Sequence, residues 1–167
     1  MIRMDIQTVM VGGGPMASMV VLRPRAARGE DGGAKLPIRI GSVEATAISL
    51  GVEGLPRRRP LTHDLLLSAI GALGASVSAV EICDVQGETF FAKLDLIGSD
   101  GRHLEIDARP SDAIALAVRA HIPIFADEKV LGAATLPDFD SVEREEEAMK
   151  LDEFHEFVEG LSPEDFA

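Results

Sequence analysis

The chain has little aromatic and thiol chemistry. Its 167 residues include no tryptophan, no tyrosine, seven phenylalanines and a single cysteine, Cys83. One cysteine excludes an intramolecular disulfide and the multi-cysteine patterns of structural zinc sites. We expect Cys83 to be a buried structural thiol within a strand, and the scarcity of cysteine favours a protein of the reducing cytoplasm.

Long apolar runs are missing as well. No stretch of about 18 apolar residues occurs, so the sequence predicts neither a membrane span nor a membrane partner. The first six residues mix apolar and charged side chains and do not resemble a secretory signal. Apolar residues nevertheless make up 46% of the chain, which is enough to build a globular core.

Basic residues are scarce at the C-terminal end. Residues 138–167 hold 12 acidic and 2 basic residues, whereas residues 1–137 hold 16 and 14. Because the net charge of −12 lies almost wholly in that segment, the nearly neutral body does not exclude nucleic acid. We predict one domain over residues 1–134, then an acidic linker and an amphipathic helix over residues 135–167. The apolar stripe of that helix is Leu151, Phe154, Phe157, Val158 and Leu161.

Hydrophobic patterning and turn residues predict an α+β fold. The expected strands cover residues 4–11, 16–22, 36–40, 77–85, 89–97, 104–108 and 123–126. The expected helices cover residues 42–53, 62–73, 111–120 and 128–134. In the second helix we expect Thr62 to be the N-cap and Leu66, Ile70 and Leu73 to form the buried stripe. Antiparallel runs of strands with helices after them favour a mainly antiparallel sheet with helices packed on it.

Two segments of the chain resemble each other. Residues 36–50 and 104–118 share an apolar frame, in which Leu36 matches Leu104 and Ile38 matches Ile106. Each segment also carries a carboxylate at the start of its predicted helix. The sequence therefore predicts a duplicated strand-strand-strand-helix unit.

Acidic residues begin three of the predicted helices. Glu44, Asp64 and Asp112 each fall in a first turn, and Pro110 can occupy the first helical position. The structural interpretation is dipole stabilisation, worth about 0.3–1 kcal/mol for each acid. That interpretation supplies no reason for the neighbouring Arg109, so a chemical role stays open.

The remaining polar candidates cluster near these helix starts. Asp107 and Arg109 lie at a strand-to-helix junction, and His63 precedes Asp64. Arginine binds phosphate through paired hydrogen bonds, and histidine is a general acid or base near neutral pH. The expected catalytic residues are His63, Asp64, Asp107, Arg109, Asp112 and Glu44. The expected substrate-binding residues are Arg57, Arg58, Arg59 and Ser111. Oxygen ligands for Mg²⁺ are available, but the pattern does not single out a metal site.

Four motifs together carry a family resemblance. They are Leu36–Gly41 (LPIRIG), Arg59–Leu65 (RPLTHDL), Gly87–Ala92 (GETFFA) and Asp107–Ala117 (DARPSDAIALA). In this order they resemble the bifunctional nuclease domain family, over roughly residues 4–131. Arg39 stands where many relatives have an aromatic residue, and Glu88 lengthens the turn before Thr89.

The resemblance implies an α+β fold and hydrolysis of both RNA and DNA. It assigns no role to individual residues. The alternative is a non-enzymatic regulatory or assembly module, in which the first-turn acids are caps and Arg109 and Asp112 form a structural pair. We also expect a homo-oligomer such as a dimer, because exposed edge strands need covering. A last hypothesis is that residues 138–167 cover the body and mimic the charge of nucleic acid.

Overall fold

The computed structural model describes residues 1–13, 17–26, 34–54 and 58–133. The chain divides into two compact units, Met1–Thr135 and Leu136–Ala167, and all described residues belong to the first. The expected linker and C-terminal helix lie outside the described residues, so the domain division stays a prediction. Among the described helices, none is long and apolar enough to span a bilayer.

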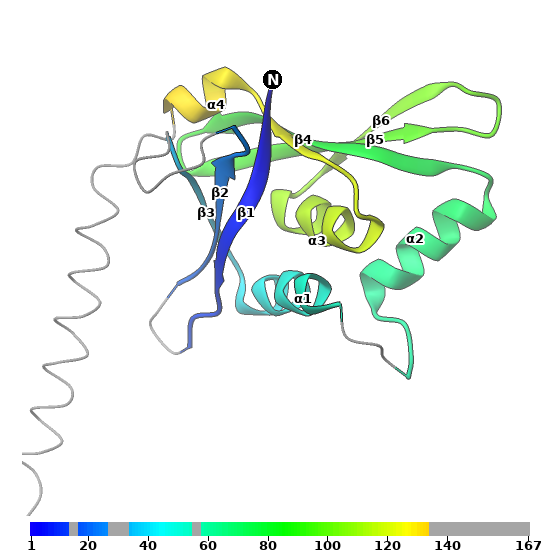
Figure 1. Ribbon diagram of the computed structural model, residues 1–167, viewed down its shortest axis with the longest axis horizontal. Coiled ribbons are helices and arrows are strands. Elements are labelled where there is room, and N and C mark those ends of the chain that lie inside the picture. Colours follow the sequence, from blue (N-terminus) through cyan, green and yellow to red (C-terminus); the bar gives the residue numbers. More distant parts are fainter. Residues whose placement is uncertain (14–16, 27–33, 55–57, 134–167) are drawn as a thin grey trace, which may run out of the picture. The chain divides into compact units, whose positions relative to one another are not determined.

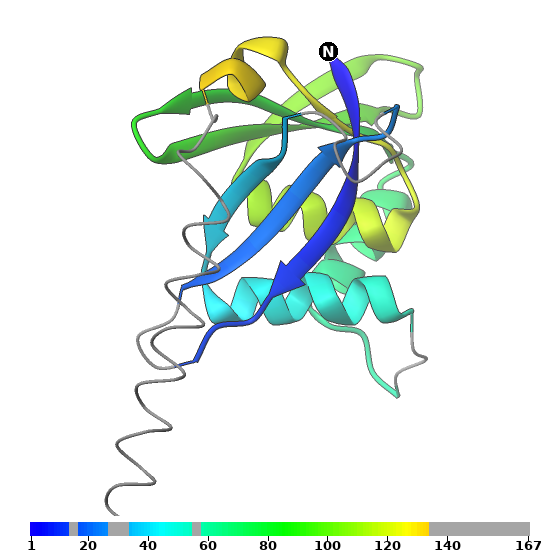
Figure 2. The ribbon, with the colours of Figure 1, turned by 60° about the vertical axis from the view of Figure 1, so that its left-hand side comes forward.

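A single seven-stranded sheet runs through the first unit, in the order β3-β2-β1-β7-β4-β5-β6. Its strands are β1 (Ile2–Met10), β2 (Ser18–Pro24), β3 (Leu36–Ile40), β4 (Ser76–Gln86), β5 (Thr89–Ile97), β6 (His103–Ala108) and β7 (Ile124–Ala126). Neighbouring strands are antiparallel except β4 and β7, which run parallel. The sheet curls, so it has an inner and an outer face (Figures 1 and 2).

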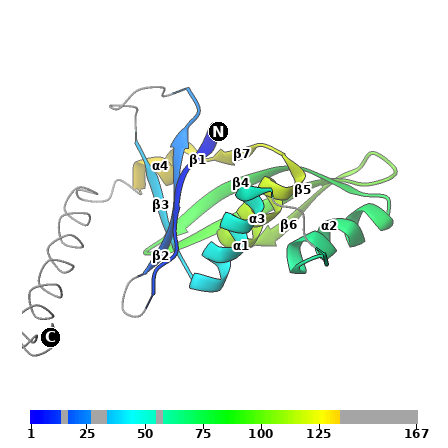
Figure 3. The same ribbon diagram turned by 60° about the horizontal axis from the view of Figure 1, so that its bottom comes forward.

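Helices cover both faces of the sheet. They are α1 (Ser42–Glu53), α2 (Thr62–Ala72), α3 (Pro110–Ala120) and α4 (Glu128–Ala133). Helices α1, α2 and α3 lie on the inner side of the curl, and α4 lies on the outer side (Figures 1 and 3). The predicted α+β class with a mainly antiparallel sheet is confirmed. Each half contains three consecutive strands followed by a helix, but an origin by duplication stays a prediction.

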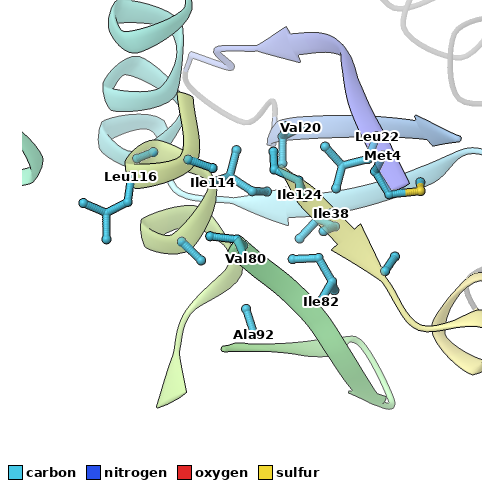
Figure 4. Packing of buried hydrophobic residues seen from close by; sticks show 14 of the residues in the cluster. Met4, Val20, Leu22, Ile38, Val80, Ile82, Ala92, Ile114, Leu116 and Ile124 are labelled. Atoms are coloured by element: carbon cyan, nitrogen blue, oxygen red, sulfur yellow. The ribbon is translucent and has the colours of Figure 1, made fainter. Parts of the chain in front are cut away.

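Helix α3 is the centre of the core. Seven of its residues are buried, from Pro110 to Ala117, because small and apolar side chains occupy nearly every position. Ile114 and Leu116 are fully buried and pack with apolar residues of the sheet (Figure 4). Burying a side chain of this size stabilises a fold by roughly 1.5–3 kcal/mol. The helix therefore has little freedom to shift relative to the sheet.

A glycine allows α1 to approach α3 closely. A Cβ atom at Gly51 would lie 2.5 Å from Cγ2 of Val118 and 2.9 Å from Nη1 of Arg119. Neither distance is compatible with a side chain, so the contact between the two helices depends on glycine at this position.

One buried guanidinium joins the three inner helices. Arg119 of α3 has an 8% exposed side chain, and its Nε lies 2.9 Å from Oδ1 of Asp64 on α2. Its Nη2 donates to the carbonyl of Ala47 on α1 at 2.9 Å, and its Nη1 donates to Ala115 within α3 at 2.7 Å. Asp64 also accepts a hydrogen bond from the backbone N–H of Leu61 at 2.8 Å. Arg119 therefore fixes α1 and α2 against α3.

Helix α2 differs from its prediction. The N-cap is Leu61, and Thr62 is the first helical residue. The expected stripe is wrong at Leu73, whose side chain is 83% exposed, and at Leu66, which is 42% exposed. Ile70 packs against the core as expected, and Leu67 packs there as well. Three consecutive leucines and a following isoleucine fit more than one helical face, so periodicity alone does not select the packed one.

We predict opposite effects for two helical glycines. Gly51→Ala forces the added methyl group into Val118 and Arg119, and we expect a loss of about 1–3 kcal/mol of unfolding free energy. Gly71→Ala in α2 meets nothing within 4 Å and should be neutral or stabilise by up to about 1 kcal/mol. Chemical denaturation of both variants measures the difference. Equal effects would show that α1 and α3 are not in close contact.

We also predict that Asp64 is structural. Asp64→Ala leaves the Arg119 guanidinium short of a partner and removes the bond to Leu61, which should cost roughly 2–4 kcal/mol. The exposed Asp107→Ala is the matched control and should change stability by less than about 0.5 kcal/mol. Thermal melting compares the two variants, and a parent-like melting temperature for Asp64→Ala would contradict the role of Arg119.

Candidate functional site

The first turns of the three inner helices contribute the side chains of the candidate site. Glu44, Asp64 and Asp112 are each the third residue of their helix. Gly41 and Arg109 are the N-caps of α1 and α3, and both have extended backbone that continues from the preceding strand. Pro110 occupies the first position of α3 as predicted. The C-terminal ends of strands β3 and β6 therefore position the first turns of α1 and α3 at the site.

Asp112 binds two other predicted site residues at once. Its Oδ1 lies 3.2 Å from Nε2 of His63, which is on α2. Its Oδ2 accepts a 2.8 Å hydrogen bond from Nε of Arg109, and Oδ1 receives a longer one of 3.3 Å from Nη2. The carboxylate thus joins the starts of α2 and α3.

Arg109 extends this cluster to α1. Its Nη1 lies 3.1 Å from Oε1 of Glu44. The glutamate carboxyl occupies space that only glycine leaves open, because a Cβ atom at Gly41 would lie 2.2 Å from Oε2 of Glu44. Glu44, Arg109, Asp112 and His63 therefore form one chain of contacts, which we call the carboxylate–arginine cluster.

The environment keeps Asp112 ionised. Partial burial of the carboxyl acts to raise its pKa, but hydrogen bonds from Arg109 and His63 outweigh burial, and the pKa lies below its ordinary value. Hydrogen bonds to Asp112 raise the pKa of the Arg109 guanidinium in turn. The pair is charged at neutral pH, and its strength is limited because the Arg109 side chain is 65% exposed.

His63 is placed to exchange protons. Its ring is 13% exposed, and a hydrogen bond from Nε2–H to ionised Asp112 leaves Nδ1 of the neutral ring as the proton acceptor. An aspartate that fixes the tautomer of a histidine is a recurring arrangement in acid–base sites. The contact can therefore orient the ring as well as stabilise the fold.

Two clefts flank the carboxylate–arginine cluster. The first, of about 410 Å³, is lined by Glu44 and Arg109 together with residues of β3, the β4–β5 turn and the start of β5. The second, of about 600 Å³, is lined by His63 and residues of α1 and the segment before α2. Asp112 connects the residues that line one cleft to the residue that lines the other.

Two other predicted catalytic residues have different surroundings. Asp64 binds Arg119 and Leu61. Asp107 lies opposite Lys93 in the β5–β6 register. Its neighbours Ile106 and Ala108 lie opposite Leu94 and Ala92, which are buried, so these neighbours face the inner side of the sheet. Because side chains alternate along a strand, Asp107 is on the outer face of the sheet, away from α3.

The predicted substrate-binding residues are not gathered at one place. Arg58 and Arg59 are exposed. Arg59 lines a separate cleft with Asp64 and Arg119. Ser111 is buried in the first turn of α3, beside the cleft at Arg109. Arg57 lies outside the described residues.

Glu44 and Asp112 are the carboxylates that could hold a divalent cation at the cluster. Both bind Arg109, which occupies the position between them. Over the part of the chain that the structure describes, no group of three or more histidine, cysteine or acidic side chains forms a metal-binding set. A cation shared by Glu44 and Asp112 would therefore have to displace the Arg109 guanidinium.

Sequence reasoning missed two residues that shape the site. Arg119 holds Asp64, and Gly41 makes room for the Glu44 carboxyl. No local pattern links Arg119 to a partner 55 positions away. For Gly41, the weak signal was a glycine placed directly before a predicted helix with an acid in its first turn. Cys83 lies within β4 as expected, but it is only half-buried.

Comparisons with known proteins identify the family of the chain. The bifunctional nuclease domain is matched by residues 26–138. An uncharacterised protein of Mycobacterium tuberculosis is 45% identical over 144 residues, which are 83% of this chain and 85% of the relative. Bifunctional nuclease 1 of Arabidopsis thaliana is 32% identical over 98 residues, covering 57% of this chain but 30% of the plant protein. Bifunctional nuclease 2 of Oryza sativa subsp. japonica is 31% identical over a segment of the same length. The chain belongs to the bifunctional nuclease domain family.

Proposed function

We propose that the chain hydrolyses phosphodiester bonds of RNA and DNA at the carboxylate–arginine cluster. The observation that carries the proposal is the single carboxylate of Asp112, which holds His63 on one side and Arg109 on the other. A proton-transfer group and a phosphate-binding group are thereby fixed next to each other. Membership of a family with relatives named bifunctional nucleases supports the same reaction.

Phosphate binding is the first part of the mechanism. The exposed guanidinium of Arg109 can pair with two phosphate oxygens. Helix N-termini carry partial positive charge, and the first turns of α1, α2 and α3 are linked at the cluster. The negative charge on the non-bridging phosphate oxygens in the transition state is stabilised by these groups, which remain in place during the reaction.

Proton transfer is the second part. His63 takes a proton from an attacking water as the new oxygen–phosphorus bond forms, and the ester bond to the leaving oxygen breaks. The same imidazole, once protonated, can return that proton to the leaving oxygen. Asp112 stays ionised, orients the ring and stabilises its positive charge. Glu44 positions Arg109 through their ion pair.

The substrate path follows from the two clefts. A nucleic acid strand that crosses the cluster would enter the cleft beside Arg109 and leave through the cleft beside His63. We expect Arg58 and Arg59 to contact flanking phosphates, because both are exposed. A divalent cation such as Mg²⁺ stays an expectation without assigned ligands, because Arg109 binds both Glu44 and Asp112. It would supply further charge neutralisation at phosphate.

A non-enzymatic regulatory or assembly module remains the second candidate. One observation favours it: each of the four side chains of the cluster already contacts another, so the ion pairs could serve only to hold three helices together. The two functions differ in what substitution of His63 does to strand cleavage.

We predict that His63→Ala and Arg109→Ala each lower the rate of RNA and DNA cleavage. Loss of the acid–base group should cost about 10²–10⁴-fold, and loss of the phosphate donor about 10²–10³-fold. The matched control is Arg3→Ala, which removes an exposed arginine of β1 and should cut at the parent rate. Rates are measured on labelled single strands and duplexes, with Mg²⁺ and with EDTA in parallel.

The same assay tests the placement of Asp107. Asp107→Asn on the outer face of the sheet should retain activity, whereas a catalytic role would lower the rate as much as His63→Ala does. Cleavage by His63→Ala and Arg109→Ala at the parent rate, after repeated purification, would identify a contaminating nuclease and contradict the proposal.

A further inference from the structure

The cleft beside His63 is mainly apolar, although it adjoins the charged residues of the carboxylate–arginine cluster. Helix α1 forms one wall, and the segment that leads into α2 forms the other (Figure 1). The apolar lining comes from Val43, Ala47, Leu50, Pro60 and Leu61. None of the described lining residues is acidic, and the volume of about 600 Å³ is typical of small-molecule sites. We call this space the α1–α2 cleft.

Two of the apolar lining residues are open to solvent. Val43, in the first turn of α1, is 77% exposed, and Leu61 is 37% exposed. Leu61 is also the N-cap of α2, a position at which serine, threonine, asparagine and aspartate are preferred. Neither residue belongs to the hydrophobic core. Stability of the fold therefore does not account for apolar side chains at these two positions, whereas a ligand with an apolar face does.

One buried side chain sets the width of the cleft. Nη2 of Arg119 donates to the carbonyl of Ala47, in the wall formed by α1, at 2.9 Å. Nε of Arg119 binds Asp64, which accepts a 2.8 Å hydrogen bond from the backbone N–H of Leu61 in the opposite wall. The two walls are thereby joined through Arg119. A cleft of fixed width binds a ligand with a small ordering cost.

Positive charge adjoins the α1–α2 cleft at two places. At the first, His63 contacts Asp112, the carboxylate that binds Arg109. At the second, Pro60 also lines the neighbouring cleft, to which the exposed Arg59 contributes. An apolar cleft between two arginines matches a nucleotide within a strand, whose base is attached between two successive phosphates. Because His63 lines the cleft, a base bound there belongs to the nucleotide next to the reacting phosphate.

We propose that the α1–α2 cleft binds the nucleobase next to the scissile phosphate, and that cleavage therefore requires an unpaired nucleotide. A base within a duplex is stacked and paired, so it enters a cleft only after it leaves the stack. Aliphatic walls take the place of tryptophan and tyrosine, which the chain lacks. Contact with the face of a base tolerates different sequences, and it involves the base rather than the sugar, so RNA and DNA both fit. This inference rests on the proposed nuclease function and adds the form of its substrate.

A duplex with one unpaired nucleotide tests where the cut falls. One labelled DNA duplex carries a single bulged thymidine, and a second duplex carries a stable abasic analogue at the same position. Both have the same charge and an interrupted helix, but only the first offers a base to the cleft. The full chain should cut beside the bulged thymidine about tenfold faster than beside the abasic residue.

Substitutions in the two walls test the cleft itself. Val43→Ser and Leu61→Ser should each abolish most of the preference for the bulged thymidine. Val52→Ser is the matched control, because Val52 is another exposed valine of α1 and does not line this cleft. It should keep the tenfold preference of the parent. All three variants should melt within a few degrees of the parent, since two replace exposed residues and serine is a preferred N-cap at position 61.

Binding distinguishes failure of this inference from failure of the nuclease function. Fluorescence anisotropy in EDTA compares a short thymidine strand with phosphorothioate linkages, which resist cleavage, with an abasic strand of equal length and charge. The thymidine strand should bind about tenfold more tightly, and Val43→Ser should lose that difference. This result in a chain that cuts no substrate would support the base-binding cleft and contradict the nuclease function.

Three results would overturn the base-binding cleft while the nuclease function stands. The first is equal cutting by the parent beside the thymidine and the abasic bulge. The second is a preference that persists in both Val43→Ser and Leu61→Ser. The third is equal affinity of the parent for the thymidine and abasic strands.

Discussion

The Asp112 carboxylate is the constraint on which the inner side of this protein depends. It accepts hydrogen bonds from His63 of α2 and from Arg109 at the cap of α3, and Arg109 in turn binds Glu44 of α1. Burial opposes the charge on Asp112, whereas the two donors favour it, and the donors prevail. Three helix starts, each with a partial positive charge, are thereby held around one anion. In the proposed function, the same partial charges favour binding of phosphate at this place.

The rest of the fold holds that carboxylate in place. Helix α3 carries Asp112, and its small buried residues fix it against the curled sheet. Gly51 allows α1 to approach, and Arg119 binds α1 and α2 at the other end of α3. Close packing at Gly51 and the contacts of Arg119, both at the C-terminal end of α3, therefore act together with the ion pairs at its first turn to set the distances within the carboxylate–arginine cluster. A first-turn acid can stabilise the fold, take part in chemistry, or do both. The contacts of Asp64 fit a structural role, and those of Asp112 fit a structural and a chemical role.

Much of the fold could be predicted from sequence, because alternation and turn residues act locally. The bounds of β3, α1 and β5 follow from such signals, and the face of β5 with Ala92 and Leu94 is buried as expected. The packed face of α2 could not be predicted, since its leucines fit several helical faces. The sequence also did not predict which site residues contact each other. Asp107 and Asp112 are near in sequence but on opposite sides of the sheet. Strand alternation could have separated them, whereas the Asp64–Arg119 pair has no local signal.

A double-mutant cycle in strand cleavage tests the central claim most directly. If Asp112 makes His63 and Arg109 one unit, then the double variant His63→Ala, Arg109→Ala should cleave about as slowly as the slower single variant, because groups that act together give strongly non-additive losses. The cycle is measured with one substrate at saturating concentration, and the single variants provide the reference. Losses that multiply in the double variant would mean that the two side chains act independently, and would contradict a single site organised by Asp112.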